Sequence, residues 1–136
     1  MNKEEIIALI KENPIAFLAT VDGNKARVRG MDTFRADADG LIFYTGKNKN
    51  VFQQIAANPE VEVCYFTKGT QVRIRGRMEV LEDMALKKEI TEKKPFLQPF
   101  YKDEASYANM AVCRLRGQAT TWTMQNLAAP TTFIDF

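Results

Sequence analysis

The stretch LIFYTGKNKNVFQQIAANPEVEVCYF (41–66) carries the strongest structural signal in this sequence. It opens with an apolar run typical of a β-strand at 41–45, and a second such run follows at 61–66. Between the two runs lie a glycine turn, a short apolar-faced segment that starts near Asn48, and the helix stop Asn58-Pro59. The stretch therefore predicts a unit of strand, turn, short helix and strand.

Upstream of this unit, the sequence predicts one helix and two strands. Asn2 and Glu5 have the spacing of a capping box, which predicts a helix of about ten residues ending at Asn13-Pro14. Runs of β type follow at 15–21 and 25–35, separated by a turn. In the second run, residues 27, 29, 31 and 33 share one face of the strand.

Downstream, the predicted elements are a long strand at 70–81 and a helix at 83–93. An irregular aromatic segment, FLQPFY, follows, with Pro95 before it and Pro99 within it. Two more strands are predicted at 109–116 and 118–124, with a turn at Arg116-Gly117. The last ten residues show no clear periodicity.

Length and element order define the expected fold class. The chain has 136 residues, the size of one domain, so we expect a single domain over 1–136. Its content of 46% hydrophobic and 26% charged residues is that of an ordinary soluble protein. Six or seven strands with short turns and three short helices favour a mainly β fold, an antiparallel barrel.

Composition also excludes several kinds of function. The chain has no histidine, which excludes imidazole-based zinc sites and Ser-His-Asp catalysis. Cys64 and Cys113 lie in apolar runs without metal-ligand spacing, so we expect buried thiols and no metal site. No apolar run approaches ~18 residues and no signal peptide is present, so we expect a cytoplasmic protein without membrane contact.

Two stretches could bind a phosphate group. In RVRGM (27–31), Arg27 and Arg29 share one strand face, and Gly30 would let a ligand approach the backbone. A solvated strand face is the alternative interpretation. In YTGKNKN (44–50), a helix begins after a glycine turn, and a helix N-terminus attracts anions.

The second stretch supplies both charged and neutral donors. Lys47 and Lys49 carry full positive charges, while Thr45, Asn48 and Asn50 offer neutral hydrogen-bond donors. The alternative is a lysine-rich surface turn in which Asn48 only caps the helix. A third stretch, TQVRIRG (70–76), presents the amide of Gln71, which suits a heteroaromatic edge but is also typical of an exposed strand.

Taken in this order, the three stretches resemble the pyridoxamine 5′-phosphate oxidase-like split-barrel flavoproteins, over about residues 1–125. FLATVDGNKARVRGM is similar to the family's first two strands, and Arg29 falls on its FMN-phosphate arginine. The stretch 41–66 is similar to a block in which a Tyr-Thr pair, here Tyr44 and Thr45, holds phosphate and ribityl chain. Gln71 falls on a glutamine that contacts the flavin.

The resemblance implies an FMN site at the interface of a homodimer. Arg29, Lys47 and Lys49 would neutralise the phosphate, with Thr45 and Asn50 as neutral partners of the phosphate or ribityl chain. The backbone around Gly30 and Met31, and the Gln71 side chain, would meet the polar edge of the ring. Trp122 and the aromatic residues Phe96, Phe100 and Tyr101 would cover the ring, in part across the dimer; the alternative is that they only pack in the core or at the dimer interface.

The sequence departs from the family pattern in two places. The family's Ser-Arg-Lys triplet falls on Lys49, Asn50 and Val51, so the usual lysine is replaced by an apolar residue. The Arg-Leu-His substrate motif of true pyridoxamine phosphate oxidases is missing. We therefore expect a short general-stress-type flavin-binding relative that does not oxidise vitamin B6.

The expected activity is that of an FMN-dependent oxidoreductase that uses a reduced nicotinamide or another small organic donor. No dedicated catalytic acid or base stands out, so the flavin would carry the redox step. One alternative is a non-catalytic module that stores or senses FMN. A nucleic-acid-binding barrel, using Arg27, Arg29, Arg73, Arg75 and Arg77 as a basic face, is a less favoured alternative, because the net charge is only +2.

Overall fold

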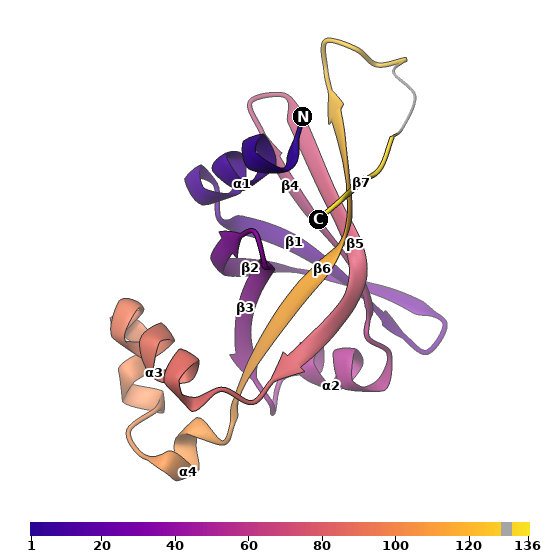
Figure 1. The fold of residues 1–136 in the computed structure, drawn as a ribbon. Coiled ribbons are helices and arrows are strands. Elements are labelled where there is room, and N and C mark those ends of the chain that lie inside the picture. Colours follow the sequence, from indigo (N-terminus) through magenta and orange to yellow (C-terminus); the bar gives the residue numbers. More distant parts are fainter. Residues whose placement is uncertain (129–131) are drawn as a thin grey trace.

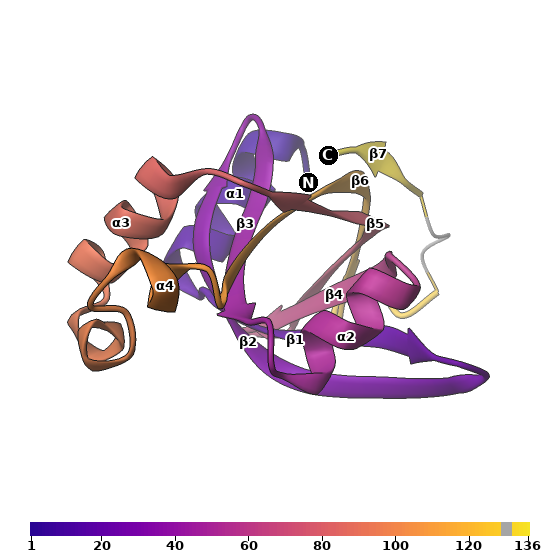
Figure 2. The same cartoon turned by 90° about the horizontal axis from the view of Figure 1, so that it is seen from below.

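One antiparallel sheet of seven strands organises the molecule (Figure 1). The computed structural model describes residues 1–128 and 132–136. The strands are β1 (Ile15–Asp22), β2 (Lys25–Asp37), β3 (Gly40–Gly46), β4 (Glu60–Thr67), β5 (Thr70–Leu81), β6 (Met110–Thr123) and β7 (Ile134–Asp135). They follow the order β3-β2-β1-β4-β5-β6-β7, and β3 also pairs with β6. This last pairing closes β1–β6 into a barrel, seen end-on in Figure 2, and confirms the expected mainly β fold.

Short helices cover the barrel and its ends. They are α1 (Lys3–Glu12), α2 (Asn50–Ala57), α3 (Met84–Lys93), the 3₁₀-helix η1 (Pro95–Phe100) and α4 (Glu104–Tyr107). The predicted capping box forms in α1, where Asn2 Oδ1 accepts from the Glu5 amide at 2.9 Å. α2 packs on β1, whereas α3, η1 and α4 form a separate group on the other side of the barrel (Figure 2).

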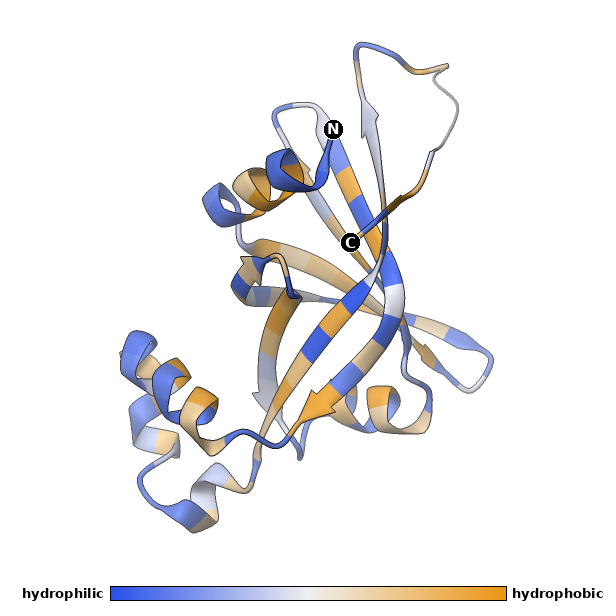
Figure 3. Ribbon diagram, viewed as in Figure 1, coloured by the Kyte–Doolittle hydropathy of each residue, from blue (hydrophilic) through white to orange (hydrophobic). Residues whose placement is uncertain are grey.

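The barrel interior is built by alternating apolar side chains. Leu18 of β1, Val63 of β4 and Ile74 of β5 are fully buried, while their neighbours along each strand point outward. Figure 3 shows this alternation as orange and blue bands along β5. Burial of such side chains supplies the main stabilisation of the barrel, because apolar area is removed from water.

The register of β1 and β2 determines where the arginines point. Arg29 pairs with Leu18, and Met31 pairs with Ala16. Both partners are fully buried, so this face of β2 is continuous with the barrel interior. The prediction that residues 27, 29, 31 and 33 share one face of the strand is therefore confirmed. This face brings Arg29 to the end of the barrel that α2 covers.

One predicted turn is wrong. Residues 109–124 were expected to form two strands, but β6 is continuous from Met110 to Thr123. Gly117 lies opposite Gly76 of β5, and a side chain at Gly117 would overlap the Arg75 carbonyl oxygen. The glycine thus permits a close approach of two long strands, because no Cβ separates them.

Two further expectations need correction. The second helix begins at Asn50 with Lys49 in the N-cap position, two residues later than the predicted start near Asn48. The proline-bracketed segment is a 3₁₀-helix instead of an irregular loop, and a short helix α4 follows it. Across residues 1–128 and 132–136, none of the helices combines the length and apolar character needed to cross a membrane.

The C-terminal residues return to the barrel. β7 pairs with β6 next to Gln118 and Ala119. The Phe136 ring is buried, and the Lys3 ammonium lies 5.3 Å from its centroid. The two chain ends therefore lie close together on one side of the barrel (Figure 1).

Candidate functional site

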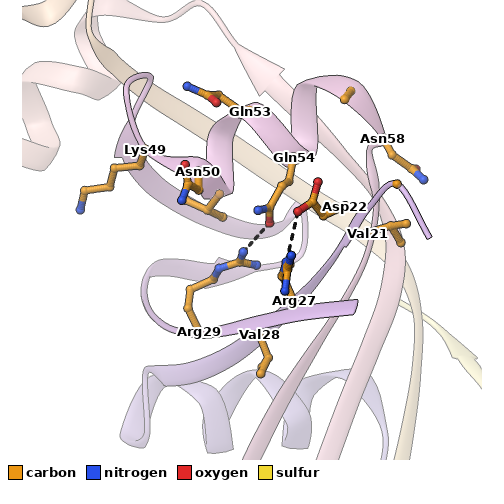
Figure 4. A pocket seen from close by; sticks show the side chains of 13 residues that line it. Val21, Asp22, Arg27, Val28, Arg29, Lys49, Asn50, Gln53, Gln54 and Asn58 are labelled. Atoms are coloured by element: carbon orange, nitrogen blue, oxygen red, sulfur yellow. Dashed lines mark hydrogen bonds and ion pairs between the residues drawn. The ribbon is translucent and has the colours of Figure 1, made fainter. Parts of the chain in front are cut away.

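Two cavities meet where α2 begins. The first, here called the aromatic cavity, has a volume of about 700 Å³ and lies between β2, β3 and η1. The second, here called the polar cavity, has a volume of about 920 Å³ and lies between the β1–β2 hairpin and α2 (Figure 4). Arg29, Lys49 and Val51 line both cavities. The junction of the two is therefore cationic.

Arg29 is held in place by three hydrogen bonds. Its Nη1 donates to Thr20 Oγ1 at 2.7 Å and to the Leu18 carbonyl at 3.2 Å. Its Nη2 donates to Gln54 Oε1 on α2 at 2.5 Å, an interaction drawn in Figure 4. Burial lowers the pKa of Arg29, but a guanidinium stays charged in proteins. The arginine thus brings a fixed positive charge to the start of α2.

The N-terminus of α2 adds to this positive potential. Lys49 occupies the N-cap position, and its amide donates to the Gly46 carbonyl at 3.0 Å. In the described part of the chain, no side chain hydrogen bond caps this end. The first amide groups of a helix carry a partial positive charge, so this end suits an anion.

A polar cluster that the sequence analysis missed borders the aromatic cavity through Asp32 and Tyr44. Asp32 Oδ2 accepts a hydrogen bond from the Tyr44 hydroxyl at 2.8 Å and forms an ion pair with Lys94 Nζ at 2.8 Å. Burial, and then the bond to Asp32, raise the pKa of Tyr44. Asp32 and Lys94 are distant in sequence, so no local motif could have joined them.

Side chains of η1 form the apolar wall of the aromatic cavity. Phe96, Leu97, Phe100 and Tyr101 line it, and Phe96 and Phe100 are 62% and 70% exposed. Tyr101 stacks on Tyr107 of α4 with ring centroids 5.8 Å apart, which anchors the segment. The structure thus brings the aromatic residues of the proline-bracketed segment to the same cavity as Arg29.

Most of the predicted site residues lie together. Those that line the aromatic cavity are Arg29, Gly30, Met31, Tyr44, Thr45, Asn48 and Lys49. Asn50 lines the polar cavity. A Cβ added at Gly30 would meet nothing within 4 Å, so a ligand can approach the backbone there. Thr45 is buried, with an exposed fraction of 8%.

Three predicted site residues line neither cavity. Lys47 forms an ion pair with Glu82, with 3.4 Å between Nζ and Oε1. Gln71 and Trp122 are cross-strand partners on β5 and β6. Their side chains lie on the outside of the sheet, so within one subunit they do not meet Arg29.

The outside of the sheet also carries exposed apolar side chains. Ile15, Phe17, Val28 and Phe66 are between 54% and 69% exposed. Phe17 pairs with Gly30 on one side and with Cys64 on the other, so β2, β1 and β4 contribute to one surface. We call this surface, together with Gln71 and Trp122 beside it, the outer sheet face.

The basic face proposed for nucleic acid does not form as one surface. Arg73 pairs with Cys64, which pairs with Phe17 and then Gly30, so Arg73 lies on the opposite side of the sheet from Arg29. Arg73 and Arg77 also form ion pairs with Glu62 and Glu60. Strand register separates these arginines, and local acids neutralise part of their charge.

Comparison with known proteins identifies the family and the fold. The family model described as pyridoxamine 5′-phosphate oxidase matches residues 3–122. A pyridoxine/pyridoxamine 5′-phosphate oxidase from Maricaulis maris is 42% identical over 45 residues, which span 32% of this chain and 20% of that protein. The match thus spans about one fifth of that relative.

Solved structures share the fold. A NimC/NimA family protein from Clostridium acetobutylicum has a TM-score of 0.80 at 22% identity, with 100% and 94% of the two chains covered. General stress protein 26 from Bacillus anthracis has a TM-score of 0.74 at 21% identity, with 98% of each chain covered. An FAD-binding protein from Mesorhizobium loti has a TM-score of 0.66 at 18% identity, with 89% and 94% covered.

The match over residues 3–122 spans most of the chain, and the split barrel is common to all three structures. The chain therefore belongs to the pyridoxamine 5′-phosphate oxidase-like family of flavin-binding split barrels.

Proposed function

We propose that this chain binds FMN in the aromatic cavity and acts as a flavin-dependent oxidoreductase on a small organic molecule. The observation that carries the proposal is the position of Arg29. A fixed guanidinium stands at the mouth of an aromatic-walled cavity, beside the start of a helix. This combination of charge and apolar surface suits a ligand that carries a phosphate at one end and a ring system at the other.

The phosphate would lie at the junction of the two cavities. Arg29 and Lys49 provide two positive charges there, and charged hydrogen bonds to phosphate oxygens are stronger than neutral ones. Thr45 and Asn50 add neutral donors on either side. Because Val51 replaces the family's usual lysine, Lys49 would supply the second charge from the preceding turn.

The residues of the aromatic cavity fit the ring of a flavin. Its volume of about 700 Å³ is within the usual range of roughly 300–1,000 Å³ for ligand pockets. Phe96 and Phe100 offer exposed ring surface, and aromatic rings prefer to stack with one another. The open backbone at Gly30 allows the polar edge of a ring to approach the β2 amides.

A bound flavin would supply the redox chemistry, by taking a hydride from a reduced nicotinamide or a similar donor and passing the electron pair on to an acceptor molecule. The protein itself would bind and orient the ligand and would control protons. The Tyr44 hydroxyl donates a hydrogen bond to Asp32, which is itself paired with Lys94, so the hydroxyl stays protonated and its oxygen can still accept a hydrogen bond from a ligand. This cluster would orient a donor group of the ligand.

We further propose that the chain works as a homodimer in the cytoplasm, with the flavin between subunits. Ile15, Phe17 and Phe66 leave apolar area exposed on the outer sheet face, and such patches mark contact surfaces. Gln71 and Trp122 lie beside them and could reach a ligand only from a second copy. A flavin-loaded monomer in sedimentation experiments would contradict this arrangement.

The visible absorption spectrum of the purified protein tests flavin binding, and calorimetric titration with FMN measures its affinity. Mixing the loaded protein with NADH or NADPH then tests the redox step. Rapid bleaching of the flavin absorption is expected. Binding without bleaching by any donor would favour the storage or sensing module, and absence of binding would contradict the proposed function.

A further inference from the structure

A third cavity lies beside the aromatic cavity and takes no part in the proposed function. Its volume is about 490 Å³, within the usual range of roughly 300–1,000 Å³ for ligand pockets. The pairing of β2 with β1 ends at Asp32, and among the described strands residues 33–37 pair with β3 alone. The cavity lies beside this free edge of β2, so we call it the edge pocket. It is lined by Ile10 and Lys11 of α1, Pro14, residues 33–37 and Lys94.

Positive charge dominates the lining of the edge pocket. Three cations, Lys11, Arg35 and Lys94, line it together with one acid, Asp37. The Asp37 carboxylate already has a partner, because its Oδ1 accepts a hydrogen bond from the Asp39 amide at 2.8 Å. A small anion in this pocket would therefore meet an excess of positive charge.

The three cations also have more hydrogen-bond donors than the protein uses. Arg35 donates to Glu89, and Lys94 Nζ lies 2.8 Å from Asp32 Oδ2, but neither acid lines the edge pocket. Lys11 forms no ion pair with any residue in 1–128 or 132–136. A guanidinium and an ammonium each carry several N–H groups, so donors remain for a ligand. Carboxylate oxygens are suitable acceptors, because both partners of the hydrogen bond are then charged.

Two contacts join the edge pocket to the aromatic cavity. In each contact, one partner lines the edge pocket and the other lines the aromatic cavity. The first is the ion pair of Lys94 with Asp32, and the second is the edge-to-face contact of Phe34 with Tyr44, whose ring centroids are 6.5 Å apart. A ligand in the edge pocket would therefore share Lys94 with the wall of the aromatic cavity.

We propose that the edge pocket binds the carboxylate of a small organic acid, and that this carboxylate competes with Asp32 for the Lys94 ammonium. Ile10, Pro14 and Phe34 provide apolar surface for the body of such an acid. A bound acid would separate Lys94 from Asp32 and so change the charge on the wall of the aromatic cavity without entering it. The inference goes beyond the proposed function, because it does not require a bound flavin.

Titration of the full chain with benzoate, followed by NMR of the backbone amides, tests binding. Saturable shifts are expected around residues 33–37 and at Lys94. Benzamide has nearly the same shape without the charge and should bind at least about tenfold more weakly, the scale of one lost charged contact. No saturable shifts with benzoate, or equal binding of benzamide, would overturn the inference.

Two lysine variants test whether Lys94 is part of the site. Lys94→Gln should raise the dissociation constant of benzoate by roughly three- to tenfold, since the side chain is 30% exposed and its contacts are partly screened. Lys88→Gln is the matched control, because Lys88 is an exposed lysine of α3 that lines none of the three cavities. It should leave the constant unchanged, and equal effects of the two variants would contradict the site.

Asp32→Asn tests the competition, because a merely structural role of the ion pair predicts no gain in affinity. Removal of the acid frees Lys94, so benzoate should bind about two- to fivefold more tightly, the scale of one partly exposed ion pair. Glu89→Gln should act in the same direction through Arg35. Unchanged or weaker binding in Asp32→Asn would overturn the inference. FMN binding is measured separately, so failure of the inference and failure of the proposed function are distinguishable.

Discussion

The barrel and the α3–η1–α4 segment differ in how they are packed. The barrel core joins buried side chains from α1, α2 and strands β1–β6 into one cluster. The second cluster, under α3 and η1, is smaller, and its buried members among the described residues are Ile42, Ile90, Met110 and Val112. The barrel therefore acts as the scaffold that places Arg29, while the segment adds an exposed aromatic wall to the same cavity.

This difference separates two kinds of mutation. A change inside the barrel should reduce stability first, because close-packed interiors do not refill a void. A change in the exposed wall should reduce ligand affinity and leave stability almost unaffected. The following predictions test that separation, beginning with the largest effect.

Leu18→Ala should lower the free energy of unfolding by about 2–5 kcal/mol, because it leaves a cavity in the barrel core. Urea unfolding followed by circular dichroism measures the change. Leu127→Ala is the matched control, since Leu127 is 70% exposed and should change stability by less than about 0.5 kcal/mol. Similar losses for the two variants would contradict the scaffold role of the barrel.

Cys113 should make the barrel sensitive to alkali. Burial raises the pKa of the Cys113 thiol from 9.0 to about 11. The folded state therefore keeps the proton more firmly than the unfolded state. The contribution of the protonated thiol to the free energy of unfolding is complete below pH 9. It is lost as the pH rises toward 11, and the loss amounts to about 2–3 kcal/mol.

Urea unfolding at several pH values compares the natural chain with Cys113→Ala. Tyr44 and Tyr65 also have raised pKa values, so both proteins should lose stability in alkali. The natural chain should lose more. An identical pH dependence in the two proteins would show that water reaches the thiol inside the barrel.

Arg29→Ala should raise the dissociation constant of FMN by about tenfold or more, the scale of one charged phosphate contact. Calorimetric titration measures it. Arg77→Ala removes an exposed strand arginine outside both cavities and should have no effect on affinity. An unchanged dissociation constant of FMN in Arg29→Ala would mean that the phosphate does not lie at Arg29.

Phe100→Ala should raise the FMN dissociation constant by roughly two- to tenfold, since an aromatic contact is worth about 0.5–1.5 kcal/mol. Its stability should stay within about 0.5 kcal/mol of the natural chain, because the ring is 70% exposed. Phe133→Ala, outside both cavities, should not change the affinity. A stability loss comparable to that of Leu18→Ala would show that η1 belongs to the core.

Local patterns in the sequence were sufficient to predict most of the helices and strands. The alternation of 70–81 predicted β5 with its observed limits, and the capping box predicted α1. The break at Gly117 was wrong, because a glycine in a strand can mark either a turn or a close strand contact. Only the presence of Gly76 on the opposite strand decides between the two.

For a similar reason, the sequence predicted some residues of the candidate site and missed others. Arg29 and Lys49 follow from motifs of a few residues, since strand alternation and a helix start are local properties. Asp32 and Lys94 meet only because η1 folds back over β2 and β3. Lys47 carries the same charge as Lys49 but turns toward Glu82, which no spacing rule in 44–50 could indicate.

The sequence by itself determined most of the β-strands, the face of β2 on which Arg29 lies, and the presence of cationic and neutral hydrogen-bond donors in 44–50, because these depend on the two-residue period of a strand and on the residues of one short segment. Only the tertiary structure decided that a polar cavity adjoins the aromatic one. That arrangement requires closure of the barrel through β3 and β6 and the packing of α2 on β1. Contacts between distant segments depend on the shape of the whole core, and no window of neighbouring residues contains that information.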